Sequence, residues 1–114
     1  MKYRHLIYKD KEITNEYLIE KKLRELNFNW LILSEFEDAE IEINIEKNTL
    51  IWNYGVWYSG KFIYGIWKNG KFLGGTFENG IWLSGDFKGT FKSGIILDIN
   101  NDGILNKNDI KFLK

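Results

Sequence analysis

Cysteine and proline are absent from the 114-residue sequence, and His5 is the only histidine. Disulfides are therefore excluded, while the redox compartment stays open. Because His5 has neither cysteine nor an evident catalytic triad to work with, we expect neither metal binding nor catalysis from it. The lack of proline suits a chain rich in strands.

Long hydrophobic runs are also missing. No apolar stretch approaches the roughly 20 residues that a membrane helix needs. The first residues, MKYRHLIYKDKE, contain no apolar core of a signal peptide. We therefore expect a cytoplasmic or virion-associated protein that does not enter a membrane.

An excess of charge of one sign is absent as well, because sixteen basic residues balance sixteen acidic ones. Residues 51–94 contain five Lys or Arg and two Asp or Glu, which is too small an excess to indicate phosphate binding. The phosphate-loop pattern G-x-x-x-x-G-K-[ST] does not occur. A nucleic-acid partner is thus not favoured.

What the sequence does contain is a five-residue repeat over residues 52–96. Glycine recurs at every fifth position from Gly55 to Gly85, and after a one-residue deletion the pattern closes with Gly89 and Gly94. Large side chains follow two residues after the glycines. With the leading tryptophan, the aromatic ones are Trp52, Trp57, Phe62, Trp67, Phe72, Phe77, Trp82, Phe87 and Phe91. A fixed short period indicates a repeat architecture.

An antiparallel meander is the first fold that this repeat permits. Asn69-Gly70 and Asn79-Gly80 are strong signals for two-residue hairpins. Short aromatic-centred strands would then be joined by x-Gly turns, with all rings on one face. The segment Gly-Ile-Trp-Lys-Asn-Gly at residues 65–70 also resembles the first half of a MORN repeat, a family whose hairpins build a single-layer sheet. The later Gly-x-Gly of that family has no counterpart here.

A right-handed pentapeptide-type β-solenoid is the alternative fold. Glycine two residues before an aromatic resembles the small residue that precedes the central Leu or Phe of pentapeptide repeats. Four pentapeptides form one square coil in that family, so residues 52–96 would give a little over two coils. Several tryptophans in such an interior argue against it, since overpacking costs about 1–3 kcal/mol per site. We therefore favour the meander within a mainly β protein that has one N-terminal helix.

The whole repeat is also similar to Gly-x-Trp-x-x-Gly-x-Phe tandem repeats in small uncharacterised proteins of large tailed phages. This resemblance implies a phage origin and no known activity.

The N-terminal part contains one good helix candidate. A short strand is expected at residues 3–8, followed by a helix at about residues 15–26 that Thr14 or Asn15 can cap. Asn27 is a suitable left-handed stop. The apolar run at residues 30–33 predicts a buried strand.

A half-buried strand at residues 39–46 is predicted from its strict alternation of apolar and polar side chains. A two-residue turn at Lys47-Asn48 would pair Ile43 with Trp52 and place Trp52 on the apolar face. Residues 1–51 should therefore be continuous with the repeat sheet, and residues 97–114 should form a C-terminal cap.

The most specific chemical pattern is DINNDGILNKND at residues 98–109. It fits the calcium-loop pattern D-x-[DN]-x-[DN]-G, in which alternate residues present oxygens and Gly103 permits the bend. The loop resembles a dockerin-type calcium segment, although a dockerin has two such segments. The resemblance implies calcium as a cofactor, held by Asp98, Asn100, Asp102, Ile104 (through its carbonyl), Asn106 and Asp109. Otherwise DINNDG is a polar turn that closes the repeat.

Two further features have competing interpretations. The acidic run over residues 35–42 could supply paired carboxylates for glycosidase chemistry, but its alternation is typical of a solvated strand face. The nine repeat aromatics either form the core or remain partly exposed as an interaction face, because one short helix cannot cover them in a single-layer sheet.

Taken together, the sequence favours a non-enzymatic structural or protein–protein interaction module that binds a protein partner or itself. One alternative is that the aromatic face stacks carbohydrate or single-stranded nucleic acid. The other is a small inhibitor of a host enzyme.

Overall fold

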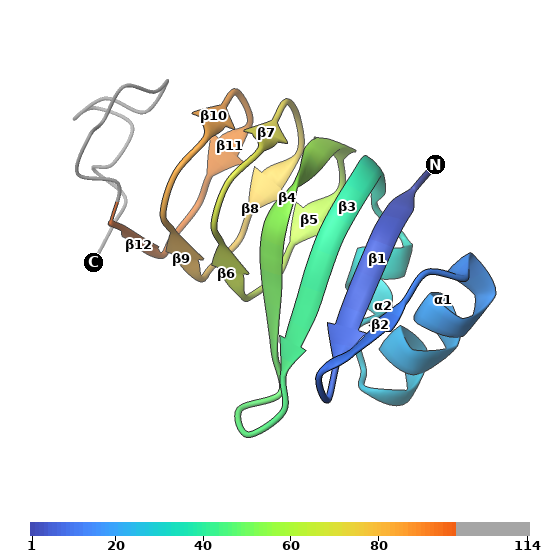
Figure 1. The fold of residues 1–114 in the computed structure, drawn as a ribbon. Coiled ribbons are helices and arrows are strands. Elements are labelled where there is room, and N and C mark those ends of the chain that lie inside the picture. Colours follow the sequence, from blue (N-terminus) through green and yellow to red (C-terminus); the bar gives the residue numbers. More distant parts are fainter. Residues whose placement is uncertain (98–114) are drawn as a thin grey trace.

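A sheet with two helices leads into a β-solenoid in the computed structural model of the chain, which describes residues 1–97 (Figure 1). The main sheet has the strand order β12-β9-β6-β4-β3-β1-β2, so it runs without a break from the N-terminal part into the repeat.

The chain begins with the strand and the helix that the sequence predicts. β1 (Tyr3–Tyr8) and β2 (Lys11–Ile13) form an antiparallel pair. α1 (Glu16–Glu25) follows, and the Asn15 side chain accepts a hydrogen bond from the Leu18 N–H at its start. The predicted strand at residues 3–8 and helix at about residues 15–26 are thus confirmed, whereas β2 was not predicted. Asn27 also has the expected left-handed conformation, with φ 69°.

The predicted strand at residues 30–33 is wrong, because this segment forms the single helical turn α2 (Asn29–Ile32). Leu31 is buried, whereas Leu33 is 83% exposed. A strand buried on both faces would have hidden both side chains. A short apolar run does not distinguish such a strand from a buried helical turn.

β3 (Glu35–Asn44) and β4 (Thr49–Ser59) form a long antiparallel pair, and β1 pairs with β3 in parallel. Trp52 lies opposite Ile41 and not opposite Ile43, because the turn is longer than predicted and Asn44–Thr49 is the last pair. A shift of two residues keeps every side chain on its face. Trp52 therefore still faces the core.

Residues 35–38 also belong to β3, which therefore begins before the strand predicted at residues 39–46 and ends two residues earlier. Asp38 has a φ of 53°, and the register with β4 shifts there. Gly55 of β4 lies against the backbone of Asp38 and Ala39 at this point. Both strands thus bend together around one corner of the solenoid.

Parallel pairing of strands fifteen residues apart turns the repeat into a β-solenoid of about three turns. The predicted alternative is therefore confirmed, and the meander of hairpins and the single-layer MORN-like sheet are not formed. The short strands are β5 (Lys61–Phe62), β6 (Ile66–Trp67), β7 (Lys71–Phe72), β8 (Thr76–Phe77), β9 (Ile81–Trp82), β10 (Asp86–Phe87), β11 (Thr90–Phe91) and β12 (Ile95–Ile96).

Each coil contains three pentapeptides and not the four of a square coil. The first sheet stacks β4, β6, β9 and β12, the second stacks β4, β7 and β10, and the third stacks β5, β8 and β11. The one-residue deletion falls at a corner. Thr90 therefore still pairs with Thr76, and Ile95 with Ile81.

The N-terminal part covers the first coil. Phe36 of β3 stacks on Trp57 with ring centroids 5.7 Å apart, and Trp30 of α2 packs edge-on against Phe62 at 5.3 Å. Ile41 lies beside Trp52 in the main sheet. In each of the three sheets of the solenoid, an N-terminal side chain therefore lies beside the first inward-pointing ring.

Candidate functional site

Three columns of stacked rings fill the solenoid. Trp52, Trp67 and Trp82 form the first column, with successive centroids 4.8 and 5.1 Å apart and planes within 8° of parallel. The other two columns contain Trp57, Phe72 and Phe87, and Phe62, Phe77 and Phe91. Each ring therefore lies on the equivalent ring of the next coil.

Neighbouring columns meet edge to face, as Trp67 and Phe72 do at 5.4 Å and 75°. This geometry suits the ring quadrupole, and a coil of three rings leaves room for tryptophan. The indole N–H groups of Trp52, Trp57 and Trp67 are buried without a hydrogen-bond acceptor in the described part of the chain.

All nine repeat aromatics are core residues. None of them is more than 5% exposed. They offer no ring face on which a sugar or a base could stack, so of the two interpretations left open by the sequence, self-packing describes them. The expected interaction face at Trp52, Trp57, Phe62, Trp67, Phe72, Phe77, Trp82, Phe87 and Phe91 is not on the surface of the solenoid.

The outer side of the first sheet carries a different apolar pattern. Isoleucines occupy the position before the inward-pointing residue in four successive strands, in direct register. That inward residue is a tryptophan in the first three strands and Ile96 in the last. Two leucines follow the inward residues of the last two strands. We call this set the ladder face: Ile51, Ile66, Ile81, Ile95, Leu83 and Leu97.

Exposure of the ladder face increases along the solenoid. Ile51 is 8% exposed, Ile66 and Ile81 are intermediate, and Ile95 is 49% exposed. The outer positions of the third sheet are polar by comparison, with Lys61, Thr76 and Thr90 in register. The apolar pattern is thus a property of one sheet and not of the repeat as a whole.

Carboxylates of the acidic run form hydrogen bonds with side chains of β4. Glu37 accepts a hydrogen bond from the Tyr58 hydroxyl at 2.8 Å, and Glu42 accepts one from the Asn53 amide at 3.0 Å. The bond to Glu37 is the main reason that the pKa of Tyr58 is raised. Within residues 1–97, no three His, Cys, Asp or Glu side chains are placed to hold a metal ion.

Polar contacts to the sheet hold helix α1 in place. The Tyr3 hydroxyl donates a hydrogen bond to Glu20 Oε2 at 2.9 Å. The pKa of Tyr3 is raised well above its usual range, mainly because the side chain is buried and secondly because of this hydrogen bond. Ile19 and Leu23 are the buried residues of the helix. These contacts fix the position of α1 relative to β1.

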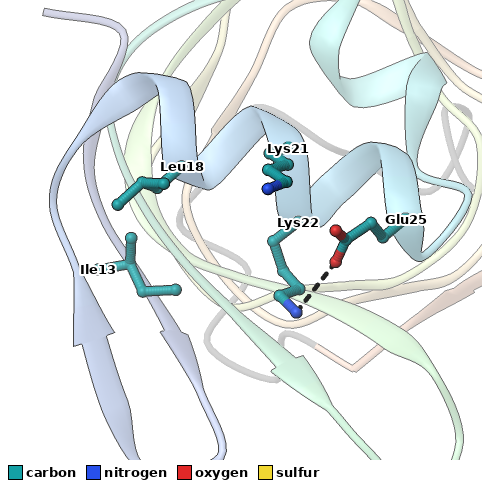
Figure 2. Close-up of a pocket in the computed structure, with 5 residues that line it drawn as sticks. All are labelled: Ile13, Leu18, Lys21, Lys22 and Glu25. Atoms are coloured by element: carbon teal, nitrogen blue, oxygen red, sulfur yellow. Dashed lines mark ion pairs between the residues drawn. The ribbon is translucent and has the colours of Figure 1, made fainter.

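A groove of about 270 Å³ lies between β2 and α1 (Figure 2). Its apolar side is formed by Ile13 of β2 and Leu18 of α1, which face each other in Figure 2, and Lys21, Lys22 and Glu25 complete the lining. Lys22 Nζ is 3.1 Å from Glu25 and 4.8 Å from the centroid of the Tyr8 ring. The groove therefore combines an apolar wall with a cationic rim.

The predicted calcium ligands lie outside the described residues. They are Asp98, Asn100, Asp102, Ile104, Asn106 and Asp109.

Comparisons of the chain with protein-family models, curated proteins and solved structures give no match. Within the described part of the chain, no helix has the length and apolar character needed to span a membrane.

Sequence reasoning missed the ladder face and the groove. The signal for the ladder was present as isoleucine at positions 51, 66 and 81, which recurs with the period of the coil and not with that of the pentapeptide. The groove had no comparable signal, because β2 and α1 come together only through tertiary packing.

Proposed function

We propose that this chain is a non-enzymatic assembly module that self-associates through the ladder face. The observation that supports this proposal is the in-register column of outward isoleucines on a single solenoid sheet. Contiguous apolar surface of this kind usually marks an interaction site. The resemblance to repeat proteins of tailed phages is compatible with such a structural role.

A second copy of the chain fits this face for a physical reason. Stacked β-strands present β-branched side chains on a nearly flat surface, and two such surfaces pack face to face about 10 Å apart. Lys68 is exposed on the same sheet, beside the isoleucines, and provides a polar margin. Burial of Ile95 and Leu97, which are 49% and 53% exposed, would supply favourable apolar area.

The two alternative functions gain no comparable support. Stacking of sugars or bases relied on an exposed aromatic face, and the repeat rings are in the core. For inhibition of a host enzyme, no feature of the described residues identifies a target.

Self-association can be tested with Ile66→Lys combined with Ile81→Lys. We expect the parent protein to sediment as a dimer or larger species and the variant as a monomer, because each lysine places a charge in the apolar contact. Sedimentation velocity over a range of concentrations measures the change. Thr76→Lys is the matched control, since Thr76 occupies the equivalent outward position on the third sheet. A parent protein that is monomeric throughout the range excludes the proposal.

We further propose that residues 98–109 bind calcium, with support from the sequence pattern alone. Isothermal titration should show heat of calcium binding for the parent protein. Asp98→Ala and Asp102→Ala should abolish or strongly weaken that binding, because each removes a hard oxygen ligand. Equal heats in parent and variants, or no heat in the parent, would rule out this site.

A further inference from the structure

We infer that the groove between β2 and α1 is a docking site for a short extended segment of a partner protein. The segment adds as a strand to the edge of β2, inserts one apolar side chain between Ile13 and Leu18, and places an acidic residue over Lys21. This site is separate from the ladder face and does not depend on self-association.

The first support is an open sheet edge. β2 is the last strand of the main sheet, and within residues 1–97 it pairs only with β1. An edge strand presents backbone N–H and C=O groups that an extended peptide can pair with. Because β2 has only three residues, Lys11–Ile13, the backbone gives limited affinity by itself. Specificity must come from the neighbouring side chains.

The second support is an apolar groove directly beside that edge. Its volume of about 270 Å³ exceeds the roughly 150 Å³ that is enough to hold a benzene molecule. Leu18 is 49% exposed, and Tyr17 next to it is 68% exposed, although the core needs only Ile19 and Leu23 from this helix. The groove therefore has room for an aliphatic or aromatic side chain and gains from burying Leu18.

The third support is the charge left over around the groove. Glu25 is paired with Lys22 at 3.1 Å, and Glu12 of β2 is 3.0 Å from His5 Nδ1. Lys11 and Lys21 are exposed and have no carboxylate within ion-pair distance in the described part of the chain. β2 carries both Lys11 and Glu12 and therefore has no net charge. Among the residues that line the groove, the charge without an ion-pair partner within residues 1–97 is that of Lys21, which favours an acidic residue beside the inserted side chain.

The test uses a fluorescein-labelled peptide of sequence EDVLVDE and fluorescence anisotropy with the full-length protein. We expect saturable binding that weakens as salt is added, and no binding of the matched peptides KKVLVKK and EDGSGDE. Backbone amide shifts should map the contact to β2 and α1. A version of EDVLVDE with N-methylated amides should bind much less, because it cannot pair with a strand.

Two variants with the same charge change complete the test. Lys21→Glu should weaken binding of EDVLVDE about tenfold, which corresponds to about 1.4 kcal/mol, while Lys61→Glu on the third sheet should leave it unchanged. Circular dichroism checks that both variants fold, and sedimentation shows that Lys21→Glu leaves self-association intact. Absence of saturable binding, or equal binding to both variants, overturns the docking site. Equal binding of the N-methylated peptide overturns strand addition.

Discussion

Trp67→Ala is expected to lower the free energy of unfolding by about 3–5 kcal/mol, the usual range for loss of a large buried aromatic. Trp67 stacks between Trp52 at 4.8 Å and Trp82 at 5.1 Å, and it also meets Phe62 and Phe72 edge to face. Its removal leaves a cavity on the axis of the solenoid that rigidly stacked rings cannot fill. Urea unfolding followed by circular dichroism measures the loss.

Leu73→Ala is the control, because Leu73 follows the inward-pointing Phe72 and is 37% exposed. We expect this change to cost about 0.5 kcal/mol, as surface substitutions usually do. A similar cost for both variants would show that the rings do not form the core. The comparison also shows that ring variants do not test assembly, since a loss of self-association in Trp67→Ala would report unfolding.

The five-residue period predicted a repeat but did not specify how it coils. Every pentapeptide has the same pattern of glycine and large side chain. Strands that pair at a separation of five, fifteen or twenty residues along the chain are therefore equally compatible with this pattern. The outward isoleucines at positions 51, 66 and 81 contain the missing information, because only a coil of three pentapeptides aligns them. The positions of the rings alone are compatible with the meander and with the square coil.

In the N-terminal part, features that depend on residues close in sequence were predicted, and features that depend on tertiary packing were not. The cap at Asn15 and the stop at Asn27 depend on backbone groups close in sequence, and both are formed. The helical turn α2 packs through Trp30 against Phe62, which lies in a distant part of the chain. No short window of sequence contains that information.

For the candidate sites too, the sequence predicted the residue types but not the features that follow from tertiary packing. The aromatic residues were recognised correctly as the dominant feature, but their burial follows from closing the coil, which the sequence pattern left open. The groove beside Leu18 arises because α1 packs against β1 and lies next to β2, the last strand of the sheet. The calcium pattern at residues 98–109 lies outside the described residues and stays a prediction.

Gly70→Ala is expected to be nearly as destabilising as the loss of a central ring. Gly70 has a φ of +119°, a conformation that costs a residue with a Cβ about 1–3 kcal/mol. An added Cβ would also overlap the carbonyl oxygen of Gly55 in the preceding coil, and Gly85 makes the same close approach to Gly70. These glycines form a corner at which successive backbones touch.

Relief of that overlap requires the coils to move apart, which would disturb both the hydrogen bond from the Asp86 N–H to the Gly70 carbonyl at 3.0 Å and the ring stacks beside it. We therefore expect a loss of about 3 kcal/mol or more in urea unfolding, beyond backbone strain alone. Ser84→Ala is the control, because Ser84 lies at the same corner one coil later and already has a Cβ. If Gly70→Ala is no more destabilising than Ser84→Ala, backbone contact does not set the spacing of the coils.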